Sequence, residues 1–122
     1  MVERIGEGEL AVMEVLWDTA PLSAAEVVAR LGPDRDWSDS TVKTMLARLV
    51  AKGALAHEED GRRYRYRPML ARDAYARTET RRLADRLFGG RAAPLVAHLA
   101  EAQTLSEEDI AELDALVQAL RK

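Results

Sequence analysis

The sequence predicts a mainly α-helical protein with one small β-hairpin, divided into an amino-terminal domain at residues 1–68 and a helical region at residues 69–122. Two observations carry this prediction. Apolar residues recur at steps of three and four in several separate stretches, and one Asp-Gly pair stands between two short extended runs. With 122 residues, the chain is long enough to bury a core of its own.

The first two predicted helices are short. The first has a single apolar stripe, formed by Leu10, Met13, Leu16 and Trp17. The second begins at a capping-box pattern, in which the Ser23 hydroxyl and the Glu26 carboxylate can each accept a hydrogen bond from a backbone N–H of the first turn. Gly32 and Pro33 should end it.

The third predicted helix follows several candidate N-caps between residues 37 and 41 and ends at Gly53. Its two faces differ in chemistry. One face is apolar and should pack inward, with Val42, Met45, Leu46, Leu49 and Val50. The other is small, polar or basic, with Ser40, Thr41, Lys43, Thr44, Ala47 and Arg48.

A β-hairpin should follow this helix. Two extended runs, at residues 54–58 and 62–67, flank a Glu59-Asp60-Gly61 turn. Because side chains alternate along a strand, Tyr64 and Tyr66 should pack toward the third helix. Arg63, Arg65 and Arg67 should point to the other side and form one basic face, and Arg62, at the start of the run, should contact DNA together with them.

The distribution of charge favours a polyanionic partner more than the total does. The formal net charge is −3, but residues 38–67 hold seven basic and four acidic side chains. Three helices followed by a hairpin with this charge predict a winged helix-turn-helix that binds DNA. Thr41, Lys43 and Thr44 should read base edges, whereas Arg48 and the hairpin arginines should contact phosphates.

Two other classes of function compete with DNA binding. Winged helices also serve as protein-docking modules, and the negative total charge suits such a role. The basic segment at residues 38–67 favours DNA. An enzyme is not supported, because the chain has no cysteine, its two histidines lie far apart, and no nucleophile with a base, metal-ligand cluster or phosphate loop is recognisable. We therefore expect no catalytic residue, metal or cofactor.

Residues 69–122 should form three further helices, near 71–88, 92–101 and 107–121, the last capped by Ser106 and Asp109. Three short helices cannot cover all of their own apolar surface, so we expect them to join two copies of the chain as a homodimer. The predicted interface residues are Leu83, Leu87, Phe88, Ile110, Leu113, Leu116, Val117 and Leu120.

The chain should be cytoplasmic and not inserted in a membrane. Its apolar runs fall far short of the roughly 18–20 residues that span a bilayer. The start of the chain, Met1 to Arg4, also lacks the basic and then apolar pattern of a secretion signal.

Beyond these patterns, the chain resembles the penicillinase repressor family. The resemblance is carried by residues 9–17, 38–49, 52–53, 64–66, 86–90 and 105–108. It implies a dimeric winged-helix repressor that blocks transcription from an inverted-repeat operator and uses Ser40, Thr41, Lys43, Thr44 and Arg48 for DNA. In the β-lactam branch, a membrane sensor metalloprotease triggers cleavage within the dimerisation region, at a stretch that matches residues 95–100 here.

Overall fold

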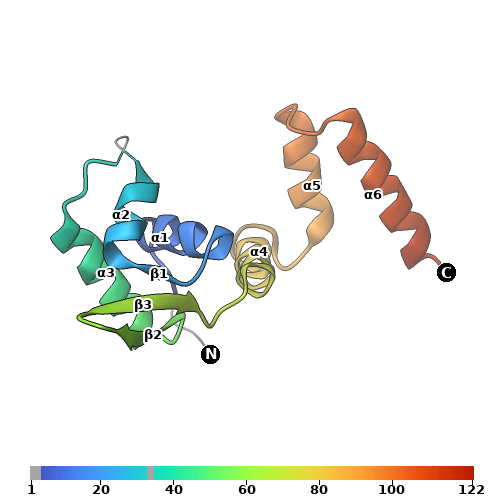
Figure 1. Ribbon diagram of the computed structural model, residues 1–122. Coiled ribbons are helices and arrows are strands. Elements are labelled where there is room, and N and C mark those ends of the chain that lie inside the picture. Colours follow the sequence, from blue (N-terminus) through green and yellow to red (C-terminus); the bar gives the residue numbers. More distant parts are fainter. Residues whose placement is uncertain (1–3, 33–34) are drawn as a thin grey trace. The chain divides into compact units, whose positions relative to one another are not determined.

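The computed structural model describes residues 4–32 and 35–122 (Figure 1). The predicted helix stop at Pro33 and the first three residues of the chain lie outside this description. The elements are α1 (Glu7–Asp18), β1 (Leu22–Ser23), α2 (Ala24–Leu31), α3 (Asp39–Ala51), β2 (Leu55–Asp60), β3 (Arg63–Pro68), α4 (Arg72–Phe88), α5 (Ala92–Glu101) and α6 (Glu107–Leu120).

The core of the amino-terminal part lies among α1, α2 and α3. It contains the apolar stripes that the sequence predicts, and the side chains with almost no exposure include Val12, Met13, Leu16, Val27, Val42, Leu46 and Leu49. The predicted capping box of α2 is present, since the Ser23 hydroxyl accepts from the Glu26 N–H and the Glu26 carboxylate accepts from the Ser23 N–H. Close packing among α1, α2 and α3 therefore fixes the orientation of α3.

The three strands form one antiparallel sheet in the order β1-β3-β2. The hairpin after α3 is confirmed, but its turn is shorter than predicted. Asp60 pairs with Arg63, so the connection is Gly61-Arg62 alone, and Gly61 has φ +67° as the first central residue of a II′ turn requires. Three helices with a hairpin after the third make this a winged helix-turn-helix, as predicted (Figure 1).

The chain separates into two compact units, residues 1–76 and 77–122. The division falls inside α4, later than the predicted boundary between residues 68 and 69, because the segment after the wing packs on the first unit. There the Trp17 Nε1–H donates to the Leu70 carbonyl at 2.8 Å, and the Trp17 and Tyr75 rings lie 5.8 Å apart. Trp17 is thus a packing residue, as the sequence suggested.

The second unit contains the end of α4 together with α5 and α6. The predicted N-cap of α6 is present, where the Ser106 hydroxyl accepts from the Asp109 N–H at 3.0 Å. None of these three helices has a buried residue. No described helix is both long and apolar enough to cross a membrane.

One ion pair that the sequence did not predict joins the ends of α1 and α3. The Lys52 ammonium lies 2.6 Å from the Glu9 carboxylate and also donates to the Arg4 carbonyl at 2.9 Å. Glu9 further accepts from the Gly6 N–H at 2.8 Å. Burial alone would raise the pKa of Glu9, but the hydrogen bonds from Lys52 and Gly6 outweigh it and lower that pKa.

We expect Lys52→Met to destabilise the protein, because it leaves a nearly buried Glu9 carboxylate without its cation. The free energy of unfolding, measured by urea denaturation at neutral pH, should fall by about 1–3 kcal/mol. Lys43→Met makes the same chemical change at an exposed position of α3 and should cost less than about 0.5 kcal/mol. Equal losses for the two variants would show that the pair does not hold α1 against α3.

Candidate nucleic-acid interface

The outer face of α3 is exposed along its whole length. All six residues predicted for this face are exposed, namely Ser40, Thr41, Lys43, Thr44, Ala47 and Arg48. The inner face is buried at Val42, Met45, Leu46 and Leu49. The Ser38 hydroxyl caps the helix by accepting from the Thr41 N–H at 3.1 Å. An exposed helix of this kind fits a major groove about 12 Å wide.

Two hydroxyls on this face are already occupied within α3. The Thr44 hydroxyl donates to the Ser40 carbonyl at 3.0 Å, and the Thr41 hydroxyl lies 3.0 Å from the Ser38 hydroxyl. Among the described residues, the side chains of Lys43 and Arg48 make neither a hydrogen bond nor an ion pair, although the Arg48 carbonyl accepts from the Lys52 N–H. Thr44 thus offers acceptor lone pairs and a methyl group, whereas Lys43 offers free side-chain donors close to the start of the helix.

The wing, which we define as β2, β3 and their turn, holds its four arginines in different environments. Arg62 lies in the turn instead of on the strand, and no described residue pairs with it. Arg63 Nη2 is 3.8 Å from the Asp60 carboxylate. Arg65 is half-buried between Asp60 and Glu26, at 3.6 and 3.9 Å. The Arg67 guanidinium lies 3.5 Å from the Met69 sulfur.

The tyrosines of the wing also differ from one another. Tyr66 packs against the core, and burial there raises the pKa of its hydroxyl. Tyr64 is 44% exposed and makes an edge contact with the His57 ring, whose centroid is 4.4 Å away. Both tyrosines lie on one face of the hairpin and line a groove together with Lys43 of α3, as predicted. Tyr64 does not reach the core, because the exposed end of the hairpin extends past it.

A groove of about 380 Å³ lies between the start of α2, α3 and the wing. The small side chains of Ser23, Ala24 and Ala25 line it on the α2 side, while Lys43 and Arg63 line it on the others. Sequence reasoning missed the contribution of α2 here. The signal that could have revealed it is the run of small residues at the first turn of a capped helix, where the backbone N–H groups favour anions.

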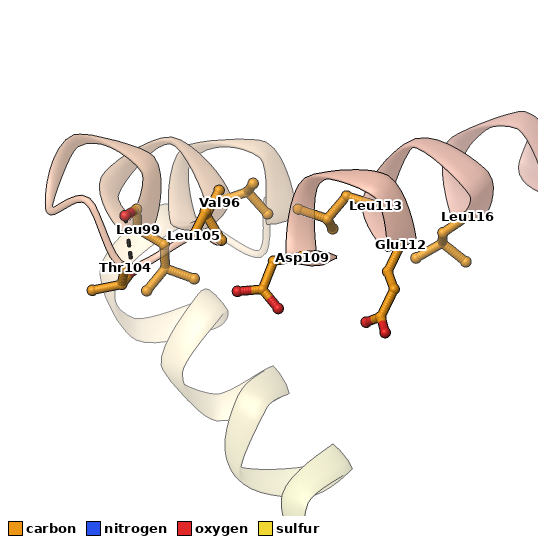
Figure 2. Close-up of a pocket in the computed structure, with 8 residues that line it drawn as sticks. All are labelled: Val96, Leu99, Thr104, Leu105, Asp109, Glu112, Leu113 and Leu116. Atoms are coloured by element: carbon orange, nitrogen blue, oxygen red, sulfur yellow. Dashed lines mark hydrogen bonds between the residues drawn. The ribbon is translucent and has the colours of Figure 1, made fainter. Parts of the chain in front are cut away.

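The second unit presents an apolar surface. Of the residues predicted for dimerisation, Leu83, Phe88 and Leu113 are half-buried, and the others are exposed, namely Leu87, Ile110, Leu116, Val117 and Leu120. A groove of about 520 Å³ between α5 and α6 continues this surface. Figure 2 shows it lined by aliphatic side chains from both helices, with the carboxylates of Asp109 and Glu112 beside them.

Comparisons with known proteins agree with this architecture. The family model described as penicillinase repressor matches residues 5–119. The penicillinase repressor of Bacillus licheniformis is 34% identical over 112 residues, covering 92% of this chain and 88% of that protein. The methicillin resistance regulatory protein MecI of Mammaliicoccus sciuri is 26% identical over 109 residues, covering 89% of each chain.

A solved structure supports the winged unit in particular. It is the solution structure of the monomeric form of Bacillus licheniformis BlaI in complex with the blaP half-operator. It is 37% identical in sequence, with a TM-score of 0.53, and covers 62% of this chain and 92% of that one.

A winged helix-turn-helix whose third helix is exposed and polar is characteristic of one class of DNA-binding domains, and this chain has that fold. Within that class, the chain belongs to the penicillinase repressor family, since the family model matches residues 5–119 of 122.

Proposed function

We propose that this protein is a DNA-binding transcriptional repressor that acts as a homodimer on an inverted-repeat operator. The observation that carries the proposal is the division of α3 into a buried apolar face and an exposed polar face, on which the side chains of Lys43 and Arg48 make no hydrogen bond or ion pair to a described residue. The relative that was solved with a half-operator supports it.

The α3 residues and the wing have different roles in this proposal. Lys43, together with Thr41 and Thr44, contacts base edges, because these residues lie near the start of α3. Arg48 and the wing residues Arg62, Arg63, Arg65 and Arg67 contact the phosphate backbone. Phosphate contacts position the protein on any duplex, while base contacts discriminate between sequences. The groove beside α2 accepts a phosphate-bearing strand next to Lys43.

Lys43→Ala and Arg62→Ala should therefore change DNA affinity in different ways. Losing a base contact should lower operator affinity by about 1–3 kcal/mol and leave affinity for unrelated DNA less affected. Losing a phosphate contact should weaken both alike and reduce the slope of log affinity against log salt by about 0.9 per wing. Fluorescence anisotropy with a duplex from upstream of the gene itself and a duplex of unrelated sequence, between about 50 and 200 mM salt, measures both.

The two variants serve as controls for each other. If their signatures are exchanged, the roles assigned to α3 and the wing are wrong. If the unmodified protein binds neither duplex, the proposal fails as a whole and the alternative, a protein-docking module, takes its place.

The homodimer is proposed through the second unit. Its helices have no buried residue, and Leu116 and Leu120 are 55% and 75% exposed. Burying such side chains against a second copy would contribute roughly 1.5–3 kcal/mol each. Two DNA-binding units on one dimer then engage two half-sites, the second at high effective concentration.

A charge at the centre of this surface should separate the copies. Leu116→Glu should shift the protein from dimer to monomer in sedimentation velocity and lower operator affinity by about 10²-fold or more, because the second half-site contact is lost. Gln118→Glu adds the same charge two positions along α6, outside the predicted apolar stripe, and should leave both measurements unchanged. A Leu116→Glu protein that stays dimeric would contradict this interface.

The signal proposed is a β-lactam response, as in the relatives named penicillinase repressor and methicillin resistance regulatory protein. The proposed partner is a membrane sensor metalloprotease, or a protease downstream of it, that cleaves within residues 95–100. That stretch lies in α5 and carries the 41% exposed Leu99. A protease needs an extended substrate, so cleavage requires local unwinding of α5.

Co-expression tests this induction step directly. With the protease gene that neighbours it in the genome and a β-lactam, immunoblots should show the chain shortened to a fragment that retains the winged unit. The same cells without antibiotic are the control. A chain that remains intact while the controlled genes are induced would contradict induction by cleavage.

A further inference from the structure

The arginine face of the wing carries its own counter-charges. The register of the hairpin sets Glu58 opposite Arg65 and Asp60 opposite Arg63. Because side chains alternate along a strand, these four residues lie on one face of the sheet. Glu59, which pairs with Tyr64, lies on the other face.

Asp60 is shared by two arginines. One oxygen of its carboxylate lies 3.8 Å from Arg63 Nη2 and 3.6 Å from Arg65 Nε. Both distances exceed those of hydrogen bonds, so these contacts are ionic and can exchange readily. Asp60 and Arg63 have half-exposed side chains, at 50% and 58%, so an incoming anion can reach both.

Arg65 is held more firmly than Arg63. Its guanidinium also reaches the Glu26 carboxylate of α2 at 3.9 Å, and its side chain is 35% exposed. The Nε atom is buried and has no hydrogen-bond acceptor among the described residues. Two carboxylates therefore surround this arginine without saturating its donors, and Asp60 is the member of the cluster that lies beside both arginines.

We propose that Asp60 limits the sequence-independent affinity of the wing for DNA, by occupying Arg63 and Arg65 as an intramolecular substitute for phosphate. This inference rests on the proposed function. A phosphate and the Asp60 carboxylate repel one another and need the same guanidinium groups, so each phosphate contact of the wing is made in competition with Asp60. Asp60 is in this sense a positioning residue that acts through its arginine neighbours.

The competition between Asp60 and phosphate for the wing arginines should mainly weaken sequence-independent binding to DNA. That binding derives from phosphate neutralisation and counterion release, so releasing an arginine increases both the affinity and its salt dependence. The base contacts assigned to α3 do not involve the wing. Asp60 thus restrains the protein on unrelated DNA while leaving the base contacts of α3 in place.

Asp60→Asn tests the proposal with little risk to the hairpin, because Asn keeps the shape of Asp60, which pairs with Arg63 on the strand and lies outside the Gly61-Arg62 turn. On a duplex of unrelated sequence at about 50 mM salt, the dimer should bind roughly three- to tenfold more tightly, and the salt slope should steepen by about 0.9 per wing. The matched control is Glu59→Gln, which removes the same charge one residue away on the other face. It should raise affinity less than Asp60→Asn does, because among the described residues Glu59 forms no ion pair with an arginine of the wing.

A second comparison shows whether Asp60 acts through its neighbours. In an Arg63→Ala background, adding Asp60→Asn should give a smaller gain than in the unmodified protein, as a double-mutant cycle requires of coupled residues. Thermal unfolding of each variant monitors the fold. Equal gains from Asp60→Asn and Glu59→Gln, or a gain with an unchanged salt slope, would overturn the inference alone. An unmodified protein that binds no duplex would overturn the proposed function as well.

Discussion

Burial of the inner face of α3 is the constraint on which the rest of the molecule depends. Val42, Leu46 and Leu49 have no exposed surface, and they lock the helix against α1 and α2. Since an α-helix turns every 3.6 residues, fixing this stripe also fixes which side chains face outward. The position of Lys43 is therefore a consequence of core packing, and a substitution that loosened the core would displace the whole outer face.

Structural features that depend only on residues close together in the sequence could be predicted. The caps at Ser23 and Ser106 depend on residues three apart, and the helices follow from local apolar spacing. The sequence predicts the hairpin correctly but places its turn at residues 59–61, whereas the turn is Gly61-Arg62. Register depends on burying Leu55 in the core and Tyr66 against it, and these residues of opposite strands are brought together only by the tertiary fold. That register moves Arg62 from a strand into the turn.

Interactions between distant segments could not be predicted. The Glu9–Lys52 pair joins residues 43 positions apart, and the Glu26–Arg65 pair joins a helix cap to the wing. For the same reason the wing looked more cationic in sequence than it is in space, where carboxylates of β2 stand opposite arginines of β3. A charge count by segment indicates a basic region, but only pairing geometry shows which cations remain available.

Because α4, α5 and α6 have no buried residue, the stability of this part of the chain should depend on the concentration of the protein. In the proposed homodimer, these helices would bury apolar surface only against a second copy and would gain their stability by mass action, so that unit would be most stable when the protein is abundant. A proposed repressor of this kind would then lose its operator contacts when its concentration falls, even without an inducer.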